Sequence, residues 1–389
     1  MAAHQPVLIA GGGIGGLTTA IALGRQSVDS TVLERSTFTE EEGAGIQLGP
    51  NATRILRALG VLEPLMAQAF RPEAIWIFDG LSGRRLCAMP LGNSAEQRYG
   101  APYLTFHRAD LHAGLRAAAE AQGCVSLSTG FDVAGIETGE NVTITNADGT
   151  SRQGAALIGA DGLWSTVREW VAPKTSLAFT GATAFRSLVP LHNAPPAFAA
   201  PIVGLWLGPR AHLVHYPVRS GKALNIVAVT ETGGQAEGWN KPVDRTALLS
   251  RFTLWCTDSK SLLERTEDWR AWSLFSLPPL PRWSRGAVTL LGDAAHPVLP
   301  YLAQGAGLAI EDADCLAQCV TAGTSDLAAA FHAYEGARRA RATRLQQAAQ
   351  RMAWVYHARG PLRLARNFAL RRRGPDALLR QFDWLYGTA

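Results

Sequence analysis

The chain has 389 residues, of which 47% are hydrophobic and 18% charged, with a formal net charge of +5. This composition argues against disorder, and the length favours two domains, or one large domain with an insertion. No apolar run approaches the roughly 20 residues of a membrane helix, and residues 1–10 carry no secretory signal. Five cysteines without a CxxC pair favour neither a disulfide framework nor a zinc ribbon. We therefore expect a soluble, cytoplasmic protein that needs no metal and binds no membrane.

A sequence pI of about 9.1 raises the question of nucleic-acid binding. Much of the positive charge lies in the last quarter of the chain, at Arg338, Arg339, Arg341, Arg344, Arg351, Arg359, Arg363, Arg366 and Arg371 to Arg373. These arginines alternate with alanine, leucine and tryptophan at helical spacing, which favours solvated faces of packed helices. Because no recognised binding module accompanies them, we expect no nucleic-acid partner.

The first 34 residues predict a strand, a glycine cluster, a helix and a second strand, with the regular elements at 6–10, 14–26 and 30–34. Helices are predicted at 51–59 and 110–122, the second capped by Asp110 and Gly123. Strands are predicted within 74–90, at 155–160, and on both sides of an Asp148-Gly149 turn.

From about residue 180 to 277 the strand–helix alternation stops, and strand-like runs at 203–207, 212–217 and 224–230 predict a sheet-rich module. A strand at 287–291 and a helix at 308–320 follow, and the rest is largely helical to about residue 372. The fold class is therefore α/β, a Rossmann-like domain with an inserted sheet-rich domain and a helical C-terminal region. We expect the dinucleotide-binding domain at 1–73, 101–178 and 281–350, the inserted domain at 74–100 and 179–280, and the helical region at 351–389.

A GxGxxG motif lies between the first strand and the first helix. Gly11 permits the tight turn, Gly13 lets a pyrophosphate approach the backbone, and Gly16 lets the helix pack on the strand. Glu34 ends the second strand at the spacing of a carboxylate that binds a ribose hydroxyl. An acid there disfavours NADP, so the motif indicates a dinucleotide site for either NAD or FAD.

Two later segments follow predicted strands. Asp161-Gly162, with Ser165 three residues on, is by itself typical of a turn followed by a helix N-cap. Gly292-Asp293 leads through a loop to a helix whose first turn contains Gly305 and Gly307. The bare N–H groups of that turn suit a negative charge, although close helix packing would also explain the glycines.

Together the three segments resemble the flavoprotein aromatic hydroxylases, the single-component group A monooxygenases, and among them the members that act on 3-hydroxybenzoate, salicylate and 6-hydroxynicotinate. The resemblance extends over nearly the whole chain, including residues 43–51, 107–111, 212–217 and 384–387. It implies one FAD per chain and NADH, or NADPH, as a transient co-substrate. The cofactor-binding residues that it implies are Gly11, Gly13, Ile14, Gly16, Glu34, Arg35, Gln47, Arg108, Asp161, Gly292, Asp293, Pro300, Gly305, Ala306 and Gly307.

The resemblance further implies reduction by NAD(P)H, formation of a flavin C4a-hydroperoxide with O2, and hydroxyl transfer to an electron-rich ring. A phenol must then lose or share its proton, a task suited to histidine near neutral pH. Strand alternation places His212 and Tyr216 on one face and His215 on the other. By resemblance His212 and Tyr216 are the catalytic pair, although a histidine within a sheet can also be purely structural.

Two positions depart from the resembling enzymes. Pro300 stands where the 3-hydroxybenzoate hydroxylases typically have glutamine, and Gln47 stands where the hydroxynicotinate enzymes have histidine. We expect an NADH-preferring hydroxylase of a small phenolic aromatic acid, working as a monomer or homodimer. Hydroxylation of an N-heterocycle such as a hydroxypyridine carboxylate, or a flavin-binding sensor without turnover, are the alternatives.

Overall fold

A computed structural model describes residues 5–38, 44–233, 238–321 and 323–387 of the chain. The first of its two large sheets has six strands in the order β18-β19-β11-β1-β2-β7, and the last five of these run parallel. The strands are β1 (Val7–Ala10), β2 (Ser30–Glu34), β7 (Val125–Thr129), β11 (Ala156–Gly159), β18 (Ser284–Arg285) and β19 (Val288–Leu290). The four residues of β1 are all buried, as expected for a central parallel strand.

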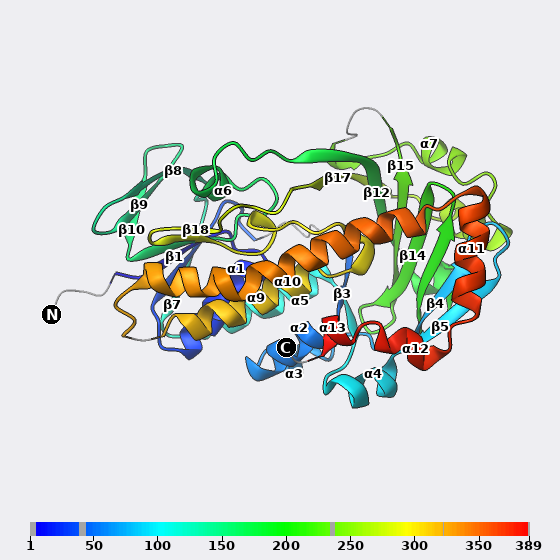
Figure 1. Cartoon of the computed structure of the whole chain (residues 1–389), viewed down its shortest axis with the longest axis horizontal. Helices are drawn as coiled ribbons and strands as arrows, with labels where there is room; N and C mark the ends of the chain where they lie inside the picture. Colours follow the sequence, from blue (N-terminus) through cyan, green and yellow to red (C-terminus); the bar gives the residue numbers. More distant parts are fainter. Residues whose placement is uncertain (1–4, 39–43, 234–237, 322, 388–389) are drawn as a thin grey trace.

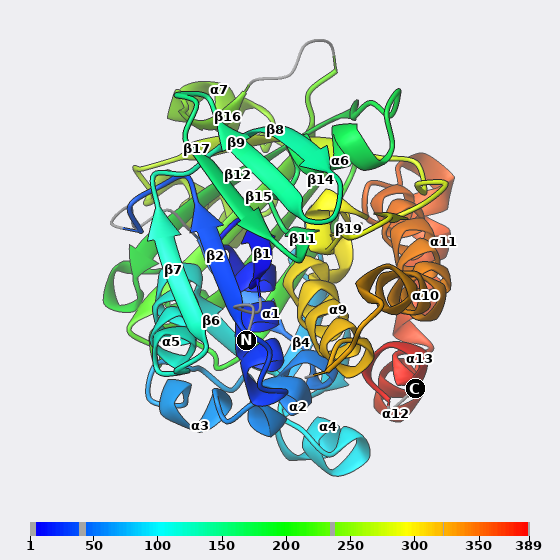
Figure 2. The same ribbon diagram turned by 90° about the vertical axis from the view of Figure 1, so that its left-hand side faces the viewer.

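Three helices pack together beside this sheet (Figures 1 and 2). They are α1 (Ile14–Arg25), α5 (Arg108–Glu120) and α9 (Gly305–Cys319). Helix α1 lies between the other two and buries nine of its residues. A three-stranded sheet of β8 (Val133–Thr138), β9 (Val142–Asn146) and β10 (Ser151–Gly154) adjoins β1, and α6 (Thr166–Val171) follows β11. The α/β, Rossmann-like character predicted from the sequence is confirmed.

The second large sheet has eight strands and lies at the other end of the molecule (Figure 1). Its order is β16-β17-β12-β15-β14-β13-β4-β5, formed by β4 (Ala74–Asp79), β5 (Arg85–Pro90), β12 (Ala178–Pro190), β13 (Val203–Gly208), β14 (Ala211–Val218), β15 (Ala223–Glu231), β16 (Trp239–Pro242) and β17 (Arg270–Ser276). Helices α7 (Arg245–Ser250) and α8 (Thr257–Glu264) belong to this end. A two-stranded sheet of β3 (Gly45–Leu48) and β6 (Leu104–His107) lies between the two large sheets, next to β14.

A 30-residue helix, α10 (Leu327–Tyr356), runs along the molecule from the parallel sheet to the eight-stranded sheet (Figure 1). Near its start it packs on α9, and near its end Met352, Ala353 and Tyr356 join a hydrophobic cluster on the eight-stranded sheet. Helices α11 (Gly360–Arg371), α12 (Pro375–Arg380) and α13 (Asp383–Tyr386) then return the chain past β5 to α2 (Pro50–Ala58). Short helices α3 (Leu62–Leu65) and α4 (Gly92–Tyr99) complete the order. The predicted helical C-terminal region is present.

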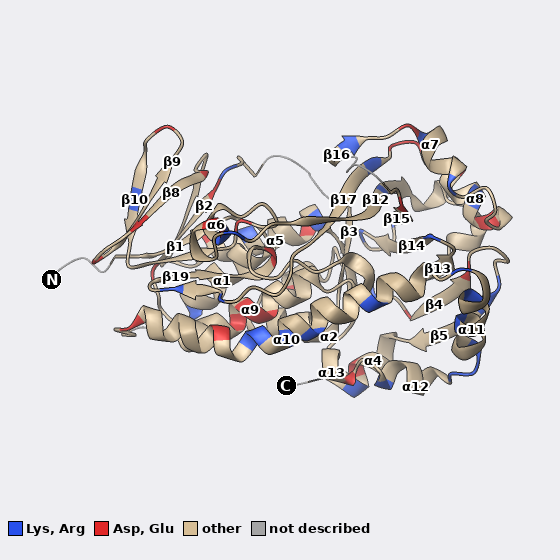
Figure 3. Ribbon diagram, turned by 45° about the horizontal axis from the view of Figure 1, so that its top comes forward, with Lys and Arg blue, Asp and Glu red and all other residues tan. Residues whose placement is uncertain are grey.

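Several local expectations need correction. Helix α5 begins at Arg108 and ends at Glu120, so Asp110 lies inside its first turn and Gly123 lies beyond its cap. Lys and Arg positions recur along α10 and α11 (Figure 3). They are not all on solvated faces, because Arg338 and Arg366 are buried and bonded within the protein. The five cysteines are free. None of the described helices is long and apolar enough to cross a membrane. The expectation about a leader falls partly on residues 1–4, outside the described residues.

Candidate cofactor and substrate site

The glycine motif forms the turn from β1 into α1 and leaves open space beside it. Gly11 has φ +104°, and a Cβ there would lie 2.4 Å from the Ala160 carbonyl oxygen. A Cβ on Gly16 would lie 1.9 Å from the Gly11 carbonyl oxygen, so the helix can pack on the turn only with glycine at this position. At Gly13 a Cβ would meet no described atom within 4 Å. Ile14, the next residue, is buried in the core.

This space belongs to a cavity of about 530 Å³ at the carboxyl ends of the parallel strands. Its lining includes six of the residues predicted to bind the cofactor, namely Gly11, Gly13, Glu34, Arg35, Arg108 and Asp161. Glu34 accepts a hydrogen bond from the Gly12 amide at 2.7 Å and two from Ser36, which hold its carboxylate at the rim of the turn. Helix α1 has no side chain capping its N-terminus, so its first N–H groups are available to a phosphate.

His112 also lines this cavity, and no sequence motif pointed to it. Its Nε2 lies 2.7 Å from the Gly12 carbonyl oxygen, and its ring contacts Phe38. Burial lowers the pKa of His112, which keeps the imidazole neutral in the cavity wall. The available signal was helical spacing, since His112 follows Arg108 by four residues and therefore lies on the same face of α5.

Asp161 and Gly162 follow β11 and form the turn expected from the sequence. Gly162 has φ +76°, and the Ser165 hydroxyl caps α6 by accepting the Arg168 amide. Asp161 Oδ2 accepts the Val167 amide at 3.1 Å, whereas its buried Oδ1 has no partner among the described residues. Burial raises the pKa of Asp161. A buried acceptor without a partner suits a hydroxyl donor of a bound cofactor.

Asp293 lies in the loop after β19, close to the N-terminus of α9. A Cβ on Gly305 would lie 3.9 Å from Asp293 Oδ1, which places the two residues side by side. Desolvation raises the pKa of Asp293, although the charges of His296, Arg108 and Arg168 act to lower it. The first turn of α9 carries no side-chain cap and contains Gly305, Ala306 and Gly307, while Pro300 lies in the short 3-10 turn before it. Gly292, next to Asp293, has φ +60°.

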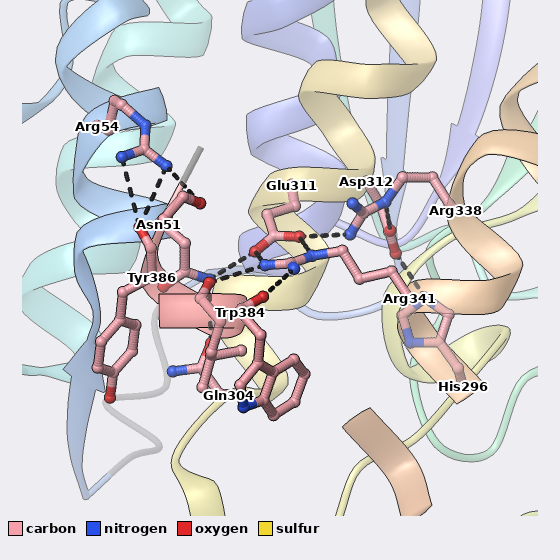
Figure 4. Close-up of polar contacts among 12 residues, drawn as sticks. Asn51, Arg54, His296, Gln304, Glu311, Asp312, Arg338, Arg341, Trp384 and Tyr386 are labelled. Carbon is pink, nitrogen blue, oxygen red and sulfur yellow. Dashed lines mark hydrogen bonds and ion pairs between the residues drawn. The ribbon is translucent and has the colours of Figure 1, made fainter. Parts of the chain in front are cut away.

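A buried ion-pair network holds α9 in place (Figure 4). Arg338 of α10 bonds to Asp312 at 2.7 Å and to Glu311 at 2.8 Å. Arg341 binds both oxygens of Glu311, at 2.6 and 2.7 Å. Although burial opposes the charge, His296 and Arg338 lower the pKa of Asp312 to about 2. His296, 2.5 Å from Asp312, is therefore part of the support beneath the loop.

The network also reaches residues remote in sequence (Figure 4). Asn51 of α2 donates to Glu311 and to Gln304, the residue before α9. Arg341 donates to the carbonyl oxygens of Trp384 and Leu385, and Arg54 donates to that of Tyr386. These hydrogen bonds connect residues 384–386 to the network around α9, the helix whose N-terminus lies beside Asp293.

His212 and Tyr216 lie on the same face of β14, as the alternation predicts. The His212 ring contacts the rings of Tyr301 and Tyr356, whereas His215 packs on the other face against Phe198 and Trp206. His212 Nδ1 lies 2.9 Å from Nε2 of His357, a contact that sequence reasoning did not anticipate. Burial and His357 hold the pKa of His212 well below its usual value.

Gln47 lies beside Tyr216 and does not line the 530 Å³ cavity. Its Oε1 accepts the Tyr103 hydroxyl at 2.7 Å, and Gln47 also acts to lower the pKa of Tyr216, against the larger effect of burial. Asn225 accepts the Gly45 amide at 2.6 Å and so joins the β3 segment to the eight-stranded sheet. Gly43, the first residue of the 43–51 segment that contributes to the family resemblance, lies outside the described residues.

Arg186 of β12 is a second residue that the sequence analysis missed. It pairs with Val227 of β15, which pairs with Val214 of β14, so Arg186 lies on the His212 and Tyr216 face. Its guanidinium stacks on Trp272, and its buried Nε has no hydrogen-bond partner among the described residues. Burial lowers the pKa of Arg186, whereas its electrostatic interaction with Tyr216 acts to raise it. The available signal was that Arg186 is the only charged residue of β12.

Comparisons with known proteins identify the family to which this chain belongs. Residues 4–349 match a family model described as FAD binding domain. The 3-hydroxybenzoate 6-hydroxylase of Polaromonas naphthalenivorans is 38% identical over 387 residues, covering 99% of this chain and 96% of that protein.

The 6-hydroxynicotinate 3-monooxygenase of Bordetella bronchiseptica is 34% identical over 90% of this chain and 91% of its own length. A solved salicylate hydroxylase substrate complex superposes with a TM-score of 0.84 at 25% identity, covering 100% of this chain and 97% of that one. The chain belongs to the FAD-binding-domain family and is a flavoprotein monooxygenase.

Proposed function

We propose that this enzyme hydroxylates a small phenolic aromatic acid, using NADH and O2. The observation that carries the proposal is Arg186, a partly buried arginine whose Nε is fully buried without a hydrogen-bond partner and which has no carboxylate partner among the described residues. A buried cation is stable only when an anion or several hydrogen-bond acceptors compensate it. A substrate carboxylate would supply both, and the planar guanidinium fits it with two parallel hydrogen bonds.

His212 and Tyr216 would receive the other end of such a substrate. Both lie on the Arg186 face, and Val214, between them on the strand, is in the same cross-strand row as Arg186. His212 is neutral at neutral pH because its pKa is low, so a ring nitrogen is free to accept a hydrogen bond from a phenol. Burial raises the pKa of Tyr216, which therefore remains a hydrogen-bond donor. A ring with a carboxylate and a hydroxyl group would satisfy all three side chains.

The cofactor-binding residues also suit FAD. Gly11 to Gly16, Glu34 and Arg108 would hold its adenosine half in the 530 Å³ cavity. Asp161 and Asp293 would accept its hydroxyl donors, and the N-terminus of α9 would face its ring system. Bound FAD supplies the chemistry that activates O2 with electrons from the nicotinamide.

The two curated relatives described above are named for 3-hydroxybenzoate and 6-hydroxynicotinate, aromatic rings that each carry a carboxylate and a hydroxyl. Every residue proposed here comes from one chain, so a monomer or a homodimer would suffice. The five free cysteines support a reducing compartment, the cytoplasm.

The test is a substrate screen with matched variants. The FAD-loaded enzyme is offered 3-hydroxybenzoate, salicylate, 6-hydroxynicotinate and the uncharged 3-hydroxybenzamide, and NADH consumption and product are measured. We expect stimulated NADH oxidation and a hydroxylated product with an acid, and little with the amide. Replacing Arg186 by glutamine should raise KM for the acid by roughly 10-fold or more, the order expected for loss of a charge-assisted hydrogen bond.

Arg270→Gln is the control, because Arg270 pairs directly with Arg186 on the neighbouring strand but is exposed. Hydroxylation of 6-hydroxynicotinate alone would make the enzyme a heterocycle hydroxylase. FAD binding without turnover of any acid would contradict the proposal and indicate a flavin-binding sensor. Unchanged KM in Arg186→Gln would remove Arg186 from substrate recognition.

A further inference from the structure

A chain of three side chains connects buried His212 to the protein surface. His212 Nδ1 lies 2.9 Å from His357 Nε2, and His357 Nδ1 lies 3.4 Å from Glu231 Oε1. The side chains of His212 and His357 are only a few per cent exposed, whereas that of Glu231 is 45% exposed. His357 directly follows α10, so the end of this helix supplies the middle of the chain.

We propose that His212, His357 and Glu231 form a relay that carries the phenolic proton of the substrate to solvent. The inference rests on the proposed function, because it takes His212 to be the group that meets the substrate hydroxyl. His212 Nδ1 already bonds to His357, so its Nε2 is the nitrogen left for the substrate.

Each transfer in the relay balances. The phenol O–H bond breaks as an N–H bond forms at His212 Nε2, and the Nδ1 proton of His212 passes to His357 Nε2. The Nδ1 proton of His357 then passes to Glu231 Oε1, from which water removes it. The substrate oxygen becomes a phenolate, and both imidazoles end neutral with their protons exchanged between nitrogens. When the product oxygen is reprotonated, the same steps in reverse restore the starting tautomers.

The environment favours transfer through the relay over storage of the proton on His212. Burial and, to a lesser extent, the positive charge of Arg366 together lower the pKa of His357 to about 4. An imidazolium at either histidine would therefore be unstable, and only movement along all three groups avoids a buried cation. The Tyr301 ring contacts both imidazoles and the Tyr356 ring contacts that of His212, while Arg210 lies 3.7 Å from Glu231.

The backbone holds the chain of groups together. The Arg210 amide donates to the His357 carbonyl oxygen at 3.2 Å, and the Glu231 amide donates to the Arg210 carbonyl oxygen at 2.9 Å. Arg210, in the turn between β13 and β14, thus fixes the positions of His357 and Glu231 relative to β14. His357 is a positioning and relay residue that acts through His212.

The experiment follows proton release when 3-hydroxybenzoate binds to the FAD-loaded enzyme, using stopped flow with a pH indicator in weak buffer and the absorbance of the bound phenolate. We expect His357→Phe to slow both signals by about 10²-fold, the lower end for loss of a proton-transfer group. Glu231→Gln should slow proton release, and imidazole added to His357→Ala should restore it. His332→Phe is the matched control, because it makes the same change at an exposed position on α10.

A second measurement needs no substrate. In nitrogen-15 spectra of the FAD-loaded protein, His357→Phe should shift the Nδ1 resonance of His212, and His332→Phe should not. Wild-type proton release in His357→Phe, or an unshifted His212 resonance, would overturn the relay. Failure of the wild-type enzyme to consume NADH with any aromatic acid would instead overturn the proposed function, which separates the two results.

Discussion

The guanidinium of Arg168 donates to the carbonyl oxygen of Ala294 at 3.1 Å and so joins the loop after β11 to the loop after β19. The same side chain donates to the Leu163 carbonyl oxygen at 2.6 Å. Arg168 is only 5% exposed, and β11 and β19 are neighbouring parallel strands. One buried arginine therefore fixes the separation of the two loops that carry Asp161 and Asp293, the proposed FAD ligands.

Replacing Arg168 by methionine should weaken FAD binding and the fold together. The change leaves buried carbonyl oxygens without donors, which costs about 1–3 kcal/mol for such groups. We expect a lower Tm of the FAD-free protein, measured by thermal unfolding, and a higher Kd for FAD, measured by flavin fluorescence. Arg285→Met is a suitable control, because the partners of the exposed Arg285 side chain among the described residues are the Trp170 carbonyl oxygen and ring. Equal Tm and Kd in Arg168→Met and wild type would contradict the role given to Arg168.

Two glycines of the same motif should respond oppositely to substitution. In Gly13→Val the new side chain enters open space, so the protein should fold normally but contain no FAD. In Gly16→Ala the Cβ would lie 1.9 Å from a backbone oxygen, so α1 must shift and stability should fall. Circular dichroism, thermal unfolding and flavin content of the two variants distinguish these outcomes. Normal flavin content in Gly13→Val would show that the pyrophosphate lies elsewhere.

Local sequence patterns predicted the elements that depend on local interactions. The strand Ser30–Glu34 has the predicted bounds, and the Asp148-Gly149 turn joins β9 to β10, with φ +86° at Gly149. Helix α5 starts earlier than its apparent cap indicated, because Asp110 instead faces Arg219 of the loop after β14, 3.3 Å away. A tertiary contact thus used the carboxylate that the local pattern assigned to capping.

The missed parts of the site depend on contacts between distant residues. His212 and His357 are 145 positions apart, and Asn51 and Glu311 are 260 apart. No periodicity within one segment encodes such pairs. Strand alternation did separate His212 from His215, because side-chain direction within a strand is a local property. The residue that faces His212 could be identified only once the position of α10 was known.

Acid should destabilise the protein through Asp312. Its pKa is 3.8 when unperturbed and about 2 in the folded protein. Since the folded value is the lower one, the charged carboxylate stabilises the fold above pH 4, and this contribution is lost as pH falls toward 2. The difference corresponds to about 2 kcal/mol. Urea unfolding between pH 5 and 2 should show a smaller decline in Asp312→Asn than in wild type, and parallel declines would contradict the argument.

The two histidines of β14 provide the sharpest test of the substrate face. His212→Ala should lower hydroxylation by about 10²–10⁴-fold, the range for loss of a general base, with FAD content unchanged. His215→Ala is unsuitable as the control, because His215 is 2% exposed and its loss would leave a cavity beside Phe198 and Trp206.

His215→Leu is the better control. It fills the same space and removes a buried Nδ1 that has no hydrogen-bond partner among the described residues, so stability should be equal or higher. Because His215 lies on the face away from Tyr301, hydroxylation in His215→Leu should match wild type when product formation is measured well below Tm. Loss of hydroxylation in His215→Leu, with near-normal rates in His212→Ala, would place the substrate on the opposite face of the sheet. Normal rates in both variants would mean that the phenol binds already ionised, or that another group removes its proton.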